Sequence, residues 1–224
     1  MCGRFANHFE SKETWESFFG EVIPDEVLKE VRIGYNICPT QIIPIFCKDA
    51  GDNDSGNGDS QYSWHASRWS IIAPWATEIS TKYATFNARS ETLSEKASYK
   101  NAFKKGQRCI IPALGYYEWK SINDEKQPYF AQRGLSEPLF FGGLYEPARD
   151  EIPHSFTVIT LPATNAMKPL HYRMPLMFAE PNSWLDTGSF DGHLVRAPWH
   201  QVSKTVNSPR NQGASLIEKV QNAN

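Results

Sequence analysis

The chain has 224 residues, of which 40% are hydrophobic and 13% aromatic, and its formal net charge is −2. This composition excludes a disordered chain and predicts a folded globule with a sizeable core. It also argues against a protein that binds nucleic acid through its overall charge. Residues 49–60, however, contain four aspartates and no lysine or arginine. Removing their charge of −4 leaves the rest of the chain at +2, which is compatible with a local basic surface.

Targeting and metal-binding signals are absent from the sequence. There is no apolar run of about 18 residues and no signal peptide, so we expect no membrane partner and a cytoplasmic protein. The four cysteines, at positions 2, 38, 47 and 109, form no C-x-x-C pair, which favours a reducing compartment over a disulfide framework. The six histidines are scattered without ligand spacing, so we expect no metal and no other cofactor.

The first part of the chain predicts two short helices and a pair of strands. Ser11 caps the first helix, and Pro24 suits the first position of the second. The apolar residues at helical spacing are Trp15, Phe18, Phe19 and Val22 in the first, and Val27, Leu28 and Val31 in the second. A loop at residues 34–39 precedes strands at 42–47 and 61–70. The acidic segment 49–60 between them predicts a solvated hairpin loop, and it lacks the final glutamate of a calcium loop.

The second part of the chain is rich in strands. Residues 71–88 show no clean period and predict a loop, whereas residues 94–105 predict a helix that stops at Gly106. The predicted strands are residues 108–112, 115–120, 129–133, 139–144 and 156–161. Short helices are expected at 180–185 and 214–220. We therefore predict one α+β domain over residues 1–224, on antiparallel or mixed β-sheets that form a barrel-like core flanked by short helices.

The start of the chain carries a reactive group if Met1 is removed. Cys2 would then hold an α-amine and a thiol on adjacent carbons, with ordinary pKa values of about 7.7–8.0 and about 8.5. Such an aminothiol reacts with an aldehyde, because the amine forms a Schiff base and the thiolate then closes a thiazolidine ring. No internal cysteine can do this, since its nitrogen lies in a peptide bond. The simpler interpretation is an ordinary cysteine after a start methionine.

Other polar residues lie in rigid, apolar surroundings, and each also has a structural interpretation. Asn87 and Arg89 could form a turn at a helix entry, with a salt bridge from Arg89 to Glu91. Strand alternation places Glu118 on the opposite face of the strand from Tyr117 and Trp119, where it could simply face solvent. His171 could be a hydrogen-bonded histidine without a catalytic role. Residues 199–203 mix polar and β-forming types, and no G-x-S-x-G elbow supports a serine triad.

Six segments together resemble the ordered signatures of the SRAP family, the SOS response-associated peptidases. They are Met1-Cys2-Gly3-Arg4-Phe5, Tyr35-Asn36-Ile37-Cys38-Pro39, Asn87-Ala88-Arg89-Ser90-Glu91-Thr92, Arg108-Cys109-Ile110-Ile111-Pro112-Ala113, Tyr116-Tyr117-Glu118-Trp119 and His171-Tyr172-Arg173-Met174-Pro175. The resemblance runs from residue 2 to about residue 216. It implies an enzyme that senses abasic sites in single-stranded DNA and shields them through a covalent thiazolidine crosslink, with a role in the DNA damage response.

The resemblance also implies roles for individual residues. Cys2 would be the nucleophile, and Asn87, Glu118 and His171 match active-site positions. The positions matching DNA-binding residues are Gly3, Arg4, Asn36, Pro39, Arg89, Trp119, Thr160 and Arg173. The implied partner is single-stranded DNA with abasic sites, and a monomer is expected. Ser70 departs from the family pattern, which has glycine there, and puts a tight backbone conformation in doubt.

Three other activities remain open from the sequence. The chain could remove its own Met1 as an autopeptidase, with Glu118 and His171 assisting. It could be a cysteine protease with Cys2 as an N-terminal nucleophile. It could also be a reader of modified bases that forms no covalent bond.

Overall fold

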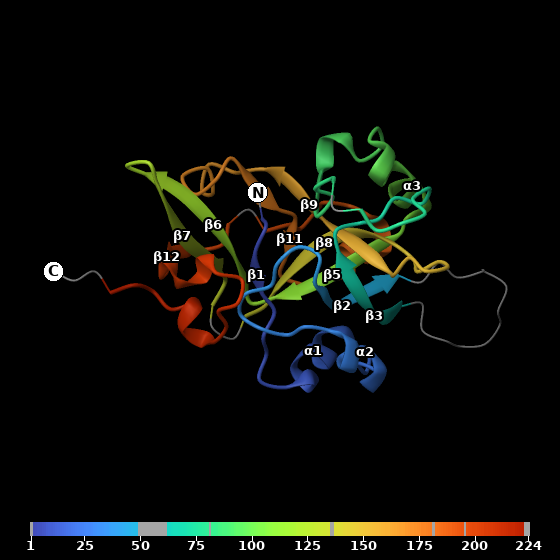
Figure 1. Cartoon of the computed structure of the whole chain (residues 1–224), viewed down its shortest axis with the longest axis horizontal. Helices are drawn as coiled ribbons and strands as arrows, with labels where there is room; N and C mark the ends of the chain where they lie inside the picture. Colours follow the sequence, from blue (N-terminus) through green and yellow to red (C-terminus); the bar gives the residue numbers. More distant parts are fainter. Residues whose placement is uncertain are drawn as a thin grey trace.

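The structure, a computed structural model, describes residues 2–48, 62–80, 82–134, 137–180, 182–194 and 196–221. Within these residues the chain forms a four-stranded and an eight-stranded sheet with short helices around them (Figure 1). The predicted α+β fold on mixed sheets is confirmed. No helix of the described part is long and apolar enough to cross a membrane. The predicted acidic loop at 49–60 lies outside the described residues.

The elements follow one another in short runs. The helices are α1 (Lys12–Phe19), α2 (Asp25–Glu30), α3 (Ala97–Lys105) and α4 (Asn182–Thr187), with 3-10 turns at Ser90–Thr92, Lys204–Asn207 and Ala214–Leu216. The strands are β1 (Phe5–Ala6), β2 (Ile42–Lys48), β3 (Tyr62–Trp69), β4 (Asn87–Arg89), β5 (Arg108–Ala113), β6 (Gly115–Ile122), β7 (Glu125–Gln132), β8 (Leu139–Glu146), β9 (Ser155–Pro162), β10 (Arg173–Pro175), β11 (Met177–Phe178) and β12 (Trp199–Gln201). Each predicted strand therefore coincides with an observed one.

The larger sheet closes on itself. Its strands follow the order β10-β9-β3-β2-β5-β8-β11, and β8 also pairs with β9, so β9, β3, β2, β5 and β8 form a ring. At Gly143 of β8 an added Cβ would lie 2.6 Å from the carbonyl oxygen of Thr157, so this closure requires glycine. The pairs of β3 and β4 with β9 are parallel, which makes the sheet mixed.

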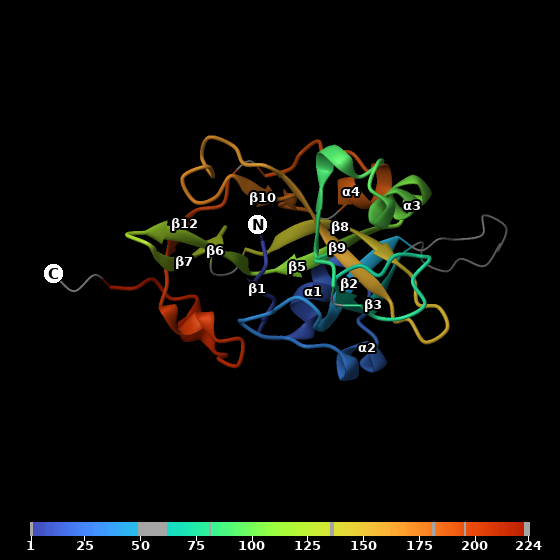
Figure 2. The same cartoon turned by 45° about the horizontal axis from the view of Figure 1, so that its top comes forward.

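Strand β1 connects the two sheets. Its backbone pairs with β6 of the smaller sheet, where Phe5 lies opposite Tyr116. The Phe5 ring packs inside the larger sheet, with its centroid 4.8 Å from Trp69 and 5.9 Å from Phe141. Burying such a ring contributes roughly 1.5–3 kcal/mol. The start of the chain is therefore held between the sheets, as both views show (Figures 1 and 2).

Three predictions of local structure need correction. Helix α1 ends at Gly20, which has a left-handed φ of 71°, so Val22 lies beyond the helix and is 69% exposed. The predicted helix at 214–220 is wrong, because only the 3-10 turn Ala214–Leu216 forms there. The predicted loop 71–88 ends in β4, which pairs with β9 and positions Asn87.

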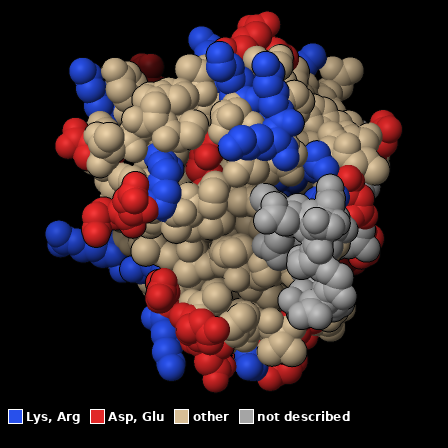
Figure 3. Space-filling model, turned by 90° about the vertical axis from the view of Figure 1, so that its right-hand side faces the viewer, with Lys and Arg blue, Asp and Glu red and all other residues tan. Residues whose placement is uncertain are grey.

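Charge is unevenly distributed over the surface. Figure 3 shows a face on which lysine and arginine gather in the upper part, where α3 lies in Figure 1. Helix α3 contributes Lys100, Lys104 and Lys105. A local basic surface thus exists in spite of the negative net charge.

Candidate active site

Cys2 lies buried at the entrance to β1. Its side chain is fully inaccessible, and its carbonyl oxygen accepts a hydrogen bond of 2.6 Å from Asn87 Nδ2. Because Asn87 sits in β4, this bond ties the start of the chain to the larger sheet. Burial raises the pKa of the Cys2 thiol well above its ordinary value, and the charge of Glu118 raises it further. The thiol is therefore protonated at neutral pH.

Glu118 is buried on the same side of β6 as Tyr116. Its exposure is only 3%, so the alternative of a solvent-facing strand residue is wrong. Strand alternation is confirmed, since the rings of Tyr117 and Trp119 lie together with centroids 6.4 Å apart. Burial raises the pKa of Glu118 from 4.5 to about 7. A carboxyl group with this pKa can both accept and release a proton near neutrality.

His171 approaches the site from the loop between β9 and β10. Its Nδ1 accepts a hydrogen bond of 3.0 Å from the backbone N–H of Arg173. Nδ1 also lies 3.1 Å from the carbonyl oxygen of Arg173, so the backbone of Arg173 orients the ring. Burial lowers the pKa of His171 below 6.5, so the neutral ring predominates at pH 7.

A cavity of about 490 Å³ brings Glu118 and His171 together, and Cys2 lies buried beside Glu118 without lining the cavity. Its lining residues are Arg4, Glu118, Trp119, Lys126, His171 and Asn207. The resemblance predicted four of them, whereas Lys126 and Asn207 were missed. Lys126 reaches the cavity only because β6 and β7 pair as a hairpin, in which it faces Ser121. Asn207 lies shortly after residues 199–203, the stretch that mixes polar and β-forming types, and no sequence motif includes it.

Arg4 is held at the edge of the cavity by three contacts. Its Nη1 donates to Asn36 Oδ1 at 2.8 Å and to the carbonyl oxygen of Val206 at 2.9 Å. Its guanidinium lies 5.6 Å from the centroid of the Trp119 ring, a cation–π distance. Trp119 Nε1 in turn donates to Asn207 Oδ1 at 2.8 Å. These contacts present a cation and an indole side by side.

Asn36 orients Arg4 from within the protein. It is fully buried, and its Nδ2 donates to the carbonyl oxygens of Val206, Ser208 and Asn211. The predicted contact of Asn36 with DNA is therefore not available to its side chain in this conformation. Its geometry supports a positioning role.

Arg173 and Thr160 also lie inside the fold. Arg173 is 7% exposed and forms an ion pair with Glu91, and its Nη2 contacts both oxygens of the fully buried Thr160. Glu91 therefore pairs with Arg173, 82 residues away in the sequence, and not with Arg89 as the structural interpretation of this segment predicted. The hydrogen bond from Arg173 lowers the pKa of Glu91 to about 2. This ion pair fixes the loop that carries His171.

The remaining predicted positions lie nearer the surface. Arg89 is exposed, and Gly3 and Pro39 are half-buried. Burial raises the pKa of Cys38, the neighbour of Pro39. The charge of the nearby Arg4 lowers that pKa by a smaller amount. The predicted residues therefore fall into an outer group, which lines the cavity or is at least partly exposed, and an inner group, which is buried within the fold.

These features define a class of protein: a ring-like α+β fold whose second residue, a cysteine, lies beside a buried carboxyl group that lines a cationic cavity. Sequence comparison agrees with this class. The family model for SOS response associated peptidase (SRAP) matches residues 1–209. The chain belongs to the SRAP family.

Several relatives carry names that refer to abasic sites. The chain is 33% identical to the abasic site processing protein YoqW of Bacillus subtilis, over 97% of this chain and 99% of that protein. It is 27% identical to the abasic site processing protein YedK of Escherichia coli, over 98% and 100% of the two chains. It is 33% identical to the abasic site processing protein HMCES of Xenopus tropicalis, over 79% of this chain and 63% of that protein.

Solved structures share the fold. A crystal structure of a Bacteroides thetaiotaomicron protein matches 98% of this chain and 100% of its own, with a TM-score of 0.74 and 20% identity. A Bordetella bronchiseptica protein matches 90% of this chain and 100% of its own, with a TM-score of 0.73 and 21% identity. At this identity the two structures support the fold alone.

Ser70 keeps a backbone conformation that favours glycine. Its φ is 138°, and its N–H donates to the carbonyl oxygen of Phe156 at 2.9 Å. Its Oγ lies 3.0 Å from Thr85 Oγ1, which compensates part of the strain. The serine therefore leaves the tight backbone conformation in place.

Proposed function

We propose that this protein senses abasic sites in single-stranded DNA and binds them covalently through Cys2 after Met1 is removed. The observation that carries the proposal is the buried Glu118 beside Cys2, with its pKa of about 7, at a cavity lined by Arg4 and Lys126. The names of the relatives supply the substrate, an abasic site.

The chemistry begins at the freed amine. Glu118 takes the proton that the Cys2 ammonium must lose before attack, and its pKa lies close to that of such an amine, about 7.7–8.0. The protonated fraction of His171 donates a proton to the ring oxygen of the deoxyribose as the aldehyde opens. The amine then attacks the aldehyde carbon, and one water leaves as the imine forms.

Ring closure follows in the same site. The thiol of Cys2 adds its sulfur to the imine carbon, and its proton goes to the imine nitrogen. The balance is one aldehyde plus one aminothiol giving one thiazolidine and one water. Because burial raises the pKa of the thiol, the amine reacts before the sulfur does. Asn87 holds the Cys2 carbonyl oxygen and so orients the amine.

DNA binding is assigned to the outer group of residues. We assign phosphate contacts to Arg4 and Lys126, which line the cavity, and to the exposed Arg89, so affinity should fall with salt and depend little on sequence. Trp119 supplies a stacking surface, worth roughly 1–3 kcal/mol per base. Asn36 and Arg173 act as positioning residues because their side chains are buried and bonded internally.

Removal of Met1 is part of the same proposal, and Glu118 and His171 are the groups that would assist an autopeptidase. A protease acting on other chains through the Cys2 thiolate is less favoured, because burial raises the pKa of that thiol. A non-covalent reader of modified bases would leave nothing attached to DNA after denaturation.

The test compares Cys2→Ala with Cys38→Ser, which removes a half-buried thiol that does not line the cavity. Each protein is incubated with single-stranded oligonucleotides that contain or lack one abasic site and then boiled in detergent. We expect a shifted band for the wild type and for Cys38→Ser, only with the abasic oligonucleotide, and none for Cys2→Ala. An undiminished band with Cys2→Ala, or no band with the wild type, would overturn the proposal.

A further inference from the structure

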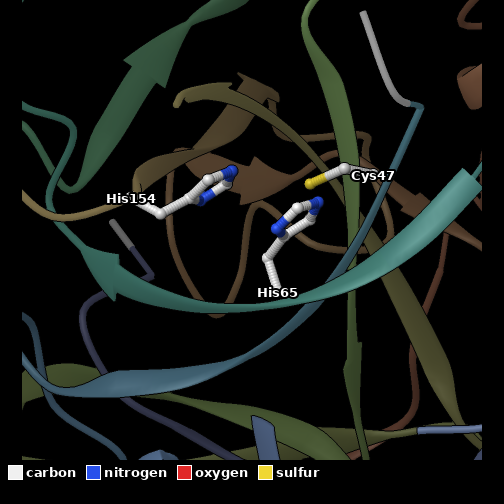
Figure 4. A group of neighbouring side chains, drawn as sticks. All are labelled: Cys47, His65 and His154. Atoms are coloured by element: carbon white, nitrogen blue, oxygen red, sulfur yellow. The ribbon is translucent and has the colours of Figure 1, made fainter. Parts of the chain in front are cut away.

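A second cluster of reactive side chains lies outside the candidate active site. Cys47 in β2, His65 in β3 and His154 just before β9 place one ligand atom each within 4.8 Å of one another. Figure 4 shows the two imidazoles facing each other with the sulfur of Cys47 beside His65. None of the three lines the cavity of the candidate active site.

Strand register explains why residues so distant in sequence meet. Cys47 lies opposite Ser63, and His65 lies opposite Ile45, in the antiparallel pair of β2 and β3. Opposite residues and alternate residues point to the same face of a sheet, so Cys47 and His65 share a face. The carbonyl oxygen of His154 accepts a hydrogen bond of 2.9 Å from the N–H of Arg68, which fixes the third residue beside β3.

The hydrogen bonds of His154 are those of a metal ligand with a supporting residue. Its Nδ1 lies 2.9 Å from Ser67 Oγ, whereas its Nε2 has no hydrogen-bond partner among the described residues. The residue is only 8% exposed, so that nitrogen is a buried polar atom without a protein partner. Histidine ligands commonly hydrogen-bond through one nitrogen and bind metal through the other.

The donor set indicates the class of ion. One thiolate and two imidazoles suit zinc or other borderline to soft ions, and they do not suit magnesium or calcium, which take oxygen ligands. Zinc sites with three protein ligands bind water in the fourth position. We propose that Cys47, His65 and His154 form a zinc site that links the β2–β3 pair to the start of β9.

Metal binding requires a small rearrangement of the two histidine rings. The rings of His65 and His154 are stacked, with centroids 4.6 Å apart and an interplanar angle of 5°. Bond lengths of about 2.0–2.3 Å put tetrahedral zinc ligands roughly 3.3–3.7 Å apart, so the atoms must approach by about 1 Å. Rotation of the half-exposed His65 ring opens the stack and brings the lone pairs together. On binding, the Cys47 thiol releases its proton to solvent.

Position in the sequence could not reveal this site. The expectation of no metal depended on ligand spacing along the chain, and these residues are brought together by pairing between strands. The proposed zinc site is independent of the proposed reaction with abasic DNA, because it shares no residue with it.

The test is a titration of the chelator-treated full-length chain with cobalt(II) and then with zinc. We expect one cobalt ion per chain with a thiolate-to-cobalt charge-transfer band, which zinc abolishes by displacing the cobalt. Cys47→Ser should lose this band, as should His65→Gln, whose half-exposed position makes it the variant most tolerant of substitution. Ser67→Ala should weaken affinity about 10–100-fold, because it removes only the supporting hydrogen bond.

Cys2→Ala is the essential control, because a freed N-terminal aminothiol can itself chelate metal. We expect Cys2→Ala and Cys38→Ser to bind cobalt as the wild type does. The proposal is overturned if the wild type gives no charge-transfer band. It is equally overturned if the band survives in both Cys47→Ser and His65→Gln, or if it disappears in Cys2→Ala.

Discussion

Replacing Glu118 with glutamine should stabilise the protein and disable its chemistry at the same time. Burial favours the neutral form of this 3% exposed carboxyl group, so its pKa rises from 4.5 to about 7. Between these values the folded state holds a proton that the unfolded state has lost, so stability falls as pH rises. The difference of about 2.5 pH units, at about 1.4 kcal/mol each, corresponds to roughly 3–4 kcal/mol.

The measurement is urea unfolding of wild type and Glu118→Gln from pH 4 to pH 8. The variant's advantage in unfolding free energy should grow by roughly 3–4 kcal/mol over this range and level off above pH 7. Crosslinking to an abasic oligonucleotide should slow by about 10²-fold or more, because the general base is lost. A stability difference that does not change with pH, or an unchanged crosslinking rate, would refute the reasoning.

Glu146→Gln is a matched control for that experiment. Glu146 is another buried carboxyl group, 4% exposed, and burial also raises its pKa. It lies in β8 and does not line the candidate active site. The stability advantage of Glu146→Gln over the wild type should grow with rising pH, as for Glu118→Gln. Crosslinking should be unchanged, so the comparison separates the effect on catalysis from the effect on stability.

Three further predictions concern the support and the surface of the site. Glu91→Gln should cost about 1 kcal/mol at pH 7, discounted for the 48% exposure of Glu91; this loss should vanish as pH falls from 4.5 towards 2, as urea unfolding would show. Ser70→Gly should raise the urea midpoint by the equivalent of about 1 kcal/mol, because it relieves a φ of 138°, and an unchanged midpoint would contradict this. Lys126→Ala should lower the salt slope of single-stranded DNA binding by about 0.7, whereas Lys29→Ala, in α2, should leave it unchanged in fluorescence anisotropy.

The sequence predicted elements with a sustained pattern and missed those without one. Helix α1 and strands β2 and β3 have enough residues for a period to emerge, and Gly106 marks the end of α3. Strands β1, β4, β10, β11 and β12 have two or three residues each, too few for any period. Pairing with longer strands stabilises them, and such pairing is a property of the folded chain.

The candidate site was predictable only where motifs were present. Cys2 and Glu118 followed from their chemistry and from the family resemblance, and the structure brings them together. The burial of Asn36 and the ion pair between Arg173 and Glu91 join segments distant in sequence. Motif matching cannot tell a residue that contacts DNA from one that orients it, because both are parts of the same segment.

Intact-mass spectrometry of the wild-type protein with an abasic single-stranded oligonucleotide measures directly whether Cys2 forms the proposed thiazolidine. We expect a protein lacking one methionine, and an adduct equal to protein plus oligonucleotide minus one water. Peptide mapping should place the adduct on Cys2, with no reduction needed to preserve it. An adduct on a lysine, or one that forms while Met1 is still attached, would contradict the account.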